Sequence, residues 1–255
     1  MYKRQVHECP GVSTQCMYVG LGLSANDGKV YAYDSSTWQQ VGGYGTIGNW
    51  EGLSIEVVTS LVSYKGKLYA ALGNTAPAAN NGDAELWEYA GTGTTWTKVA
   101  GDGVNTSWNY SGATAYGPYE AIYTTSVYNG DLYVGLGFSA DSSAFADAEV
   151  WKWSGSGNWT KVGGDGENGS WDFGQTYESV RSMAVYNGEL YVGLGDTAAT
   201  NYVDSEVWKW NGSIWTIVGG EAGNNNSWSD TVTPLKEQVF ALTNYRGKLY
   251  AGRCV

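Results

Sequence analysis

A repeated segment limits the folds open to this chain more than any other feature. The string VYNGDLYVGLG (127–137) returns almost unchanged as VYNGELYVGLG (185–195), and weaker copies lie at 63–73 and 244–252. Each copy contains two apolar runs joined by a two-residue turn. Asn-Gly at the turn supplies the positive φ angles of a type I′ turn, so each copy predicts a tight β-hairpin.

A second marker sets the period of the repeat. The strings WQQVGG, WTKVAG, WTKVGG and WTIVGG begin at residues 38, 96, 159 and 215. Their spacing is about sixty residues, and each unit reads as four strands, which is typical of a propeller blade. The sequence therefore predicts an all-β propeller with blades at approximately 12–43, 56–101, 120–164 and 178–220, and a partial blade at 237–255.

The fifth hairpin (239–252) has no outer strands after it. This arrangement favours an arc cut from a propeller of about five to seven blades. The alternative is a four-bladed ring that is closed by the strand 239–245.

Side-chain size follows the same architecture. The two inner strands of each unit are rich in Ala, Ser, Gly and Val, whereas tryptophans concentrate in the two outer strands. Blades diverge with distance from the axis, so bulky outer residues fill the widening gap at normal packing density. We expect the tryptophans at 38, 96, 159 and 215 to pack between blades.

The repeat resembles the kelch repeat. The resemblance rests on LYVGLG, on an aromatic residue before a turn (VYAYDSSTW, 30–38; VWKWSGSGNW, 150–159) and on a tryptophan five to seven residues later. It extends over residues 17–255, with Gly-Leu-Gly or Ala-Leu-Gly in place of the kelch double glycine. The resemblance implies a propeller that binds proteins or is associated with carbohydrate; a few such propellers are copper oxidases.

Composition excludes several functions. The net charge of −11 argues against nucleic acid or an anionic membrane as a partner. No segment reaches transmembrane length. The cysteines Cys9, Cys16 and Cys254 fit neither a disulfide framework nor a metal motif, although a disulfide between the two ends stays open. MYKRQ (1–5) resembles a translated sequencing adapter from a metagenomic library, so we expect residues 1–11 to be non-native or disordered.

Candidate binding residues lie on the face that carries the long, variable loops, because function concentrates on loops held by a rigid scaffold. A glutamate starts each predicted inner strand: Glu56, Glu120, Glu178 and Glu237. These carboxylates either hydrogen-bond to a neighbouring blade or form a ligand site at the channel mouth. Tyr123 and Arg181 occupy equivalent positions that differ between repeats, as do Thr59 and Phe240, which suits one asymmetric partner.

Each long loop also contains a tryptophan: Trp50, Trp108, Trp171 and Trp228. They either fill gaps between blades or act as stacking platforms for sugar rings. The same loops hold weak calcium candidates: Asp102, Asn105, Asp165 and Asn168. No DxDxDG motif accompanies them, so the sequence predicts no metal and no cofactor.

Catalysis has few candidate residues. The single histidine, His7, lies in the doubtful N-terminal segment and rules out Ser-His-Asp and imidazole-based zinc sites. The leading hypothesis is a non-catalytic, lectin-like or protein-binding module on the cell surface or outside the cell, which recognises a glycan or a partner protein. The alternatives are a structural spacer in a large surface protein and a glycan-active enzyme that uses paired carboxylates.

Overall fold

The structure is a computed structural model. It describes residues 3–9, 14–24, 26–43, 50, 55, 57–74, 84–108, 121–137, 148–171, 179–195, 205–220, 227 and 238–254. The chain divides into two compact units. Unit 1 contains Met1–Thr125 and Gly155–Trp159, and unit 2 contains Ser126–Ser154 and Thr160–Val255.

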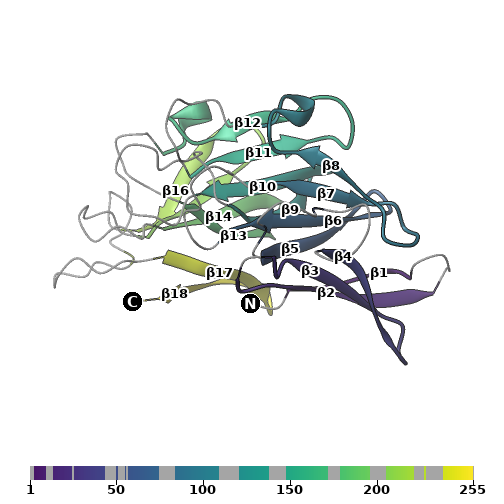
Figure 1. Cartoon of the computed structure of the whole chain (residues 1–255). Helices are drawn as coiled ribbons and strands as arrows, with labels where there is room; N and C mark the ends of the chain where they lie inside the picture. Colours follow the sequence, from purple (N-terminus) through teal and green to yellow (C-terminus); the bar gives the residue numbers. More distant parts are fainter. Residues whose placement is uncertain are drawn as a thin grey trace. The chain divides into compact units, whose positions relative to one another are not determined.

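Unit 1 holds two groups of four antiparallel strands, each paired in chain order (Figure 1). The first group is a separate sheet and the second is part of a larger one; we call each group of four a sheet. The first sheet consists of β1 (Lys3–Glu8), β2 (Gln15–Leu21), β3 (Lys29–Tyr33) and β4 (Trp38–Gly43). The second consists of β5 (Val57–Tyr64), β6 (Lys67–Gly73), β7 (Leu86–Tyr89) and β8 (Trp96–Ala100), followed by the 3-10 turn η1 (Val104–Thr106). Strand β9 (Ala121–Tyr128) begins in unit 1 and ends in unit 2.

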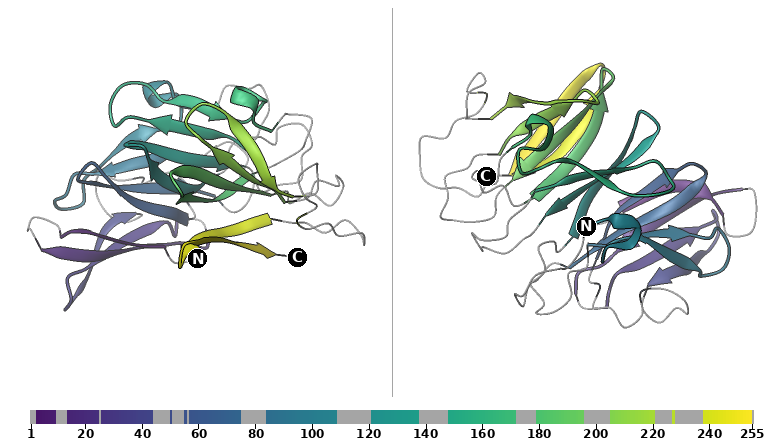
Figure 2. Two further views of the ribbon diagram at one scale, coloured as in Figure 1. Left: turned by 180° about the vertical axis from the view of Figure 1, so that it is seen from behind. Right: turned by 90° about the horizontal axis from the view of Figure 1, so that it is seen from above.

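Unit 2 repeats the pattern. Its first strands are β10 (Asp131–Gly137), β11 (Val150–Trp153) and β12 (Thr160–Gly163), followed by the 3-10 turn η2 (Glu167–Gly169). The next sheet consists of β13 (Ser179–Tyr186), β14 (Glu189–Gly195), β15 (Val207–Trp210) and β16 (Trp215–Gly219). In the last hairpin, β17 (Gln238–Tyr245) lies against β13 and β14 and pairs with β18 (Lys248–Cys254) (Figure 2).

The predicted turns join the inner strands. Asn129 and Asn187 have φ angles of 49°, and the glycines after them have φ angles of 83° and 78°. Both central residues of each turn are therefore left-handed, as a type I′ turn requires. The turns Lys65-Gly66 and Arg246-Gly247 have the same geometry.

Neighbouring sheets within a unit meet at single residue pairs. Gly73 pairs with Ala121 in unit 1, and Gly137 with Ser179 and Gly195 with Gln238 in unit 2. Each pair joins the end of one sheet's second strand to the start of the next inner strand. The all-β propeller fold predicted from the sequence is thereby confirmed, and the number of blades stays a prediction.

Tryptophans fill the space between adjacent sheets. Trp96, Trp159 and Trp215 expose 3–4% of their surface. Their indole nitrogens donate to the backbone oxygens of Val41, Val99 and Val162 in the preceding fourth strand. Packing between blades is confirmed for these three residues. Trp38 is the exception: it is 52% exposed and stacks on Tyr33 of its own sheet.

Residues 3–8 form a paired strand, so disorder is wrong for this part of the segment 1–11, and its non-native origin stays a prediction. All six residues of β1 pair with β2, from Lys3 opposite Gly20 to Glu8 opposite Gln15. A disulfide joins Cys9 to Cys16 beside this hairpin. The first sheet thus begins at β1, nine residues before the boundary expected at 12, because sequence reasoning discounted its inner strand.

Within the described ranges, no helix is long and apolar enough to span a membrane.

Candidate functional site

Most of the long-loop face falls outside the described residues. This holds for the four glutamates predicted at the channel mouth, Glu56, Glu120, Glu178 and Glu237, and for Trp228. Their roles stay predictions.

The described loop tryptophans are part of the core. Trp50, Trp108 and Trp171 expose 2–5% of their surface. Each indole nitrogen donates to a backbone oxygen just before the third strand of its own sheet, at 2.8, 2.6 and 2.5 Å for Gly28, Ala84 and Ala148.

Each of these indoles also meets the outer tryptophan of the next sheet edge to face. The ring centroids are 5.4 Å apart for Trp50 and Trp96, 5.6 Å for Trp108 and Trp159, and 5.3 Å for Trp171 and Trp215. We call each couple an indole pair. A stacking platform for sugars needs an exposed ring face. That interpretation of Trp50, Trp108 and Trp171 is therefore wrong, and they fill the gap between sheets instead.

The calcium candidates are engaged by the protein itself. The carboxylate of Asp102 lies 2.8 Å from the ammonium of Lys98, and that of Asp165 lies 2.7 Å from Lys161. The side-chain amides of Asn105 and Asn168 donate to backbone oxygens. An ammonium group beside each carboxylate supplies the positive charge that calcium would bring. Among the described residues, no cluster of three or more His, Cys, Asp or Glu side chains could hold a metal.

Sequence reasoning missed a set of buried glutamates. Glu85, Glu149 and Glu206 are 1–3% exposed and lie directly before the third strands. The indole of the tryptophan two residues later donates to each carboxylate, at 2.7 Å for Glu85 and 2.6 Å for the other two. The recurring spacing Glu-x-Trp is visible in the sequence, but the spacing alone does not indicate that the carboxylate is buried.

A lysine from the fourth strand completes two of these networks. Lys98 lies 2.8 Å from Glu85, and Lys161 lies 2.9 Å from Glu149. Burial raises the pKa of the Glu85 carboxyl, against the lowering effects of Lys98 and Trp87. Burial acts to lower the pKa of Lys98, but bonds to Asp102 and Glu85 outweigh it and the pKa is raised. These groups hold the outer strands together and are not free to act on a ligand.

The variable inner-strand positions coincide with β-bulges. Pairing within the inner hairpins skips Thr59, Arg181 and Phe240. A bulge leaves its extra residue unpaired and redirects the side chain. In unit 1 the Thr59 hydroxyl donates to the backbone oxygens of Ala71 and Ile122, and Tyr123 is half-buried.

In unit 2 the guanidinium of Arg181 lies 5.9 Å from the ring centroid of Phe240, whose side chain is 44% exposed. This geometry is a cation–π contact. The bulges therefore present chemically different side chains on otherwise equivalent strands.

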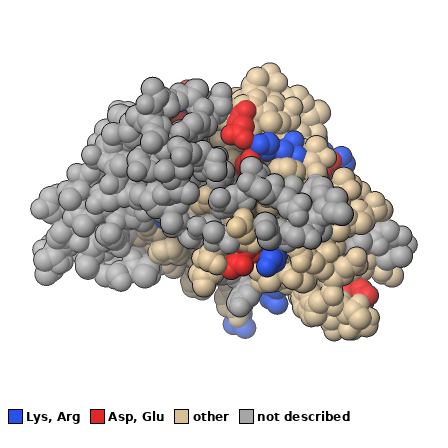
Figure 3. Space-filling view, in the orientation of Figure 1, with Lys and Arg blue, Asp and Glu red and all other residues tan. Residues whose placement is uncertain are grey.

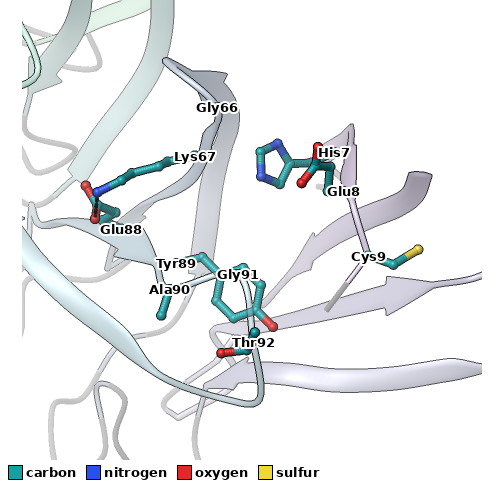
Figure 4. Close-up of a pocket in the computed structure, with 10 residues that line it drawn as sticks. All are labelled: His7, Glu8, Cys9, Gly66, Lys67, Glu88, Tyr89, Ala90, Gly91 and Thr92. Atoms are coloured by element: carbon teal, nitrogen blue, oxygen red, sulfur yellow. Dashed lines mark hydrogen bonds and ion pairs between the residues drawn. The ribbon is translucent and has the colours of Figure 1, made fainter. Parts of the chain in front are cut away.

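A cavity of about 600 Å³ lies in unit 1, at the ends of strands joined by short turns. Its lining comprises His7, Glu8, Cys9, Gly66, Lys67, Glu88, Tyr89, Ala90, Gly91 and Thr92. Figure 4 shows Lys67 and Glu88 on one side of this cavity and His7 and Glu8 on the other. The sequence directed attention to the long-loop face, so this cavity was not predicted.

The cavity is polar and carries both charges. Lys67 lies 2.6 Å from Glu88, which also accepts a hydrogen bond from Tyr69 at 2.9 Å. His7 shares a hydrogen bond of 3.0 Å with Ser63. Burial lowers the pKa of His7, although Glu8 acts to raise it. The cavity's size and its mixture of donors and acceptors suit a small polar ligand.

Charge is mixed among the described residues on the face that Figure 3 draws. In Figure 3, acidic and basic side chains lie next to one another rather than in large patches of one sign. The ion pairs Lys98–Asp102 and Lys161–Asp165 follow this pattern.

No family model matches the chain, so no family match accompanies the kelch resemblance. No curated protein matches it either. Among solved structures it is similar to a glycoside hydrolase family 43 arabinoxylan arabinofuranohydrolase from Bacillus subtilis, in complex with cellotetraose. That similarity has a TM-score of 0.48 and 14% identity, and covers 87% of this chain and 50% of that one. The chain thus spans half the length of that structure, and a similarity at this level does not bear on function.

Proposed function

We propose that this chain is a non-catalytic binding module that acts outside the cell. The observation that carries the proposal is the set of bulged inner-strand positions. The sheets repeat the same indole pairs and the same turns, yet the bulges bear Thr59, Arg181 and Phe240. Different side chains at equivalent places on a rigid repeat suit one asymmetric partner, such as a protein segment.

The Arg181–Phe240 contact forms the most distinctive part of this surface. A half-exposed phenylalanine next to a guanidinium offers an apolar face and a cation together. Aromatic and arginine side chains contribute most to protein interfaces. The ligand is therefore a segment that presents an apolar group beside an acidic group.

A glycan is the second candidate, and the cavity in unit 1 favours it. The Lys67–Glu88 pair, Glu8 and His7 provide donors and acceptors for hydroxyl groups. The cavity replaces the loop tryptophans as the place where a sugar would bind.

The disulfide supports a location outside the cell or on its surface. Disulfides persist in oxidising compartments and are rare in the cytosol. Cys9 and Cys16 are bonded in the first sheet, so the module is proposed to be extracellular or on the cell surface.

The test screens the protein against a displayed peptide library and a glycan array, then titrates the strongest ligands against variants. A bulge-site ligand should lose about tenfold or more in affinity with Arg181→Ala or Phe240→Ala. A cavity ligand should lose affinity with Glu88→Gln instead. Thr97→Ala, at an exposed position of β8, is the control.

Three results would overturn the proposal. Ligands that bind all four variants equally well would exclude both sites. Absence of any ligand on either platform would favour the structural spacer. Chromatographic detection of cleaved glycan would show that the module is an enzyme.

A further inference from the structure

The outer edge of β18 has no neighbouring strand among the described residues. In the other sheets the second strand lies between two strands: β2 pairs with β1 and β3, β6 with β5 and β7, and β14 with β13 and β15. Within the described part of the chain, β18 pairs only with β17. Its outward backbone groups are therefore open to pairing with another strand.

The side chains of β18 are correspondingly uncovered. Leu190 and Val192 of β14 are fully buried. Their equivalents in β18, Leu249 and Ala251, are half-buried and exposed, respectively. Tyr250 is 48% exposed. The sequence of β18 thus carries the apolar residues of a central strand on an uncovered edge.

Charge follows a rule at the contact between second and third strands. The first residue of the second strand forms an ion pair with a residue of the third strand. That third-strand residue lies opposite the tyrosine of the second strand. Lys67 pairs with Glu88 at 2.6 Å, Asp131 with Lys152 at 3.9 Å, and Glu189 with Lys209 at 3.0 Å. The opposite residues are fixed by register: Tyr69 with Glu88, Tyr133 with Lys152, and Tyr191 with Lys209.

The first sheet carries no charge at these two positions. Its tyrosine, Tyr18, lies opposite Ala32, and the second-strand residue at the charged position is Cys16, which is in the disulfide. The rule therefore rests on the other three sheets.

Strand β18 has a lysine at the charged position of the second strand. It begins Lys248-Leu249-Tyr250, as β6 begins Lys67-Leu68-Tyr69. By the rule, a strand that paired with this edge would carry an acidic residue opposite Tyr250.

We propose that the open edge of β18 is a docking edge for the outer β-hairpin of a blade repeat whose first strand carries an acidic residue opposite Tyr250. The closest example within this chain is β7, Leu-Trp-Glu-Tyr at 86–89. Strand addition of this kind takes affinity from backbone hydrogen bonds and specificity from alternate side chains. The hairpin of β15 and β16, with Lys209 at the same place, would set two cations side by side and is disfavoured.

The experiment extends the full chain after Val255 with a copy of residues 74–101, so that the appended hairpin can reach β18. Hydrogen exchange of the β18 amides is then followed by mass spectrometry. The extended chain should show about tenfold or greater slowing of β18 exchange relative to the unextended chain. The appended copy with its Glu88→Lys change should weaken this protection by about threefold to tenfold, and Lys248→Glu in the same chain should restore it.

Two outcomes contradict the proposal. In one, β18 exchange is unchanged by the extension or is indifferent to both charge reversals. In the other, sedimentation shows that the unextended chain forms a dimer that Lys248→Glu dissociates, which would make a second copy the occupant. Exchange in β6 provides the internal control, because its edge is already covered by β7.

Discussion

At the scale of residues, the chain buries polar and aromatic groups where local sequence suggests exposure. Trp171 follows a loop of Gly, Asp, Glu and Asn, yet it is 4% exposed because the next sheet supplies Trp215 as its packing partner. Glu149 is 3% exposed because Trp151 and Lys161 satisfy its carboxylate. Both environments depend on contacts between strands that are distant in sequence.

The Lys161 network gives a stability prediction. Lys161→Met removes the cation beside a buried carboxylate, so Glu149 is left without its ion-pair partner. Discounted for the partial exposure of Lys161, the free energy of unfolding should fall by about 1–3 kcal/mol in urea titrations. The double variant Glu149→Leu with Lys161→Met should recover part of the loss. Equal stability of Lys161→Met and the unmodified protein would show that the pair is not buried.

His7 gives a prediction of pH dependence. Burial lowers its pKa from the ordinary value of 6.5, so folding favours the neutral imidazole. The stabilisation is complete above pH 6.5 and is lost as the pH falls through the lowered pKa. Thermal unfolding between pH 7.5 and about pH 5 should show a decline that is smaller for His7→Gln. Parallel curves for the two proteins would contradict a buried neutral histidine.

At the scale of elements, the strands and turns were readable from the sequence. The Asn-Gly pairs and the Leu-Tyr-Val-Gly-Leu-Gly runs are local signals, and the structure has hairpins at those places. Strand β1 was missed because the sequence KRQVHE has no strong alternation and resembled foreign sequence. The bulges were also missed, since a one-residue shift in pairing depends on the partner strand.

The disulfide gives the prediction for this scale. Cys9 and Cys16 close a short loop between β1 and β2. Such a crosslink restricts the unfolded chain, so Cys9→Ser with Cys16→Ser should lower the free energy of unfolding by about 2 kcal/mol. Adding a reductant should destabilise the unmodified protein and leave the double variant unchanged. Equal stability of the unmodified protein and the double variant without reductant would contradict a stabilising bond between Cys9 and Cys16.

At the scale of the whole molecule, repetition explains what the sequence could reveal. Four copies of one pattern made the all-β propeller and its indole-rich outer strands predictable, because the same signal appears several times. The candidate site was predicted far less well. The loop tryptophans Trp50, Trp108 and Trp171 are buried in the core, and Tyr123 and Arg181 remain candidates. The cavity beside His7 had no sequence signal because it forms between two sheets of unit 1.

The central claim is that the repeated indoles belong to the core and leave binding to other residues. Oxidative footprinting with mass spectrometry measures the reactivity of each tryptophan in the folded protein. Trp38, which is 52% exposed, should react first, whereas Trp50, Trp108 and Trp171 should react at least about tenfold more slowly. Reactivity of Trp108 and Trp171 equal to that of Trp38 would contradict the account.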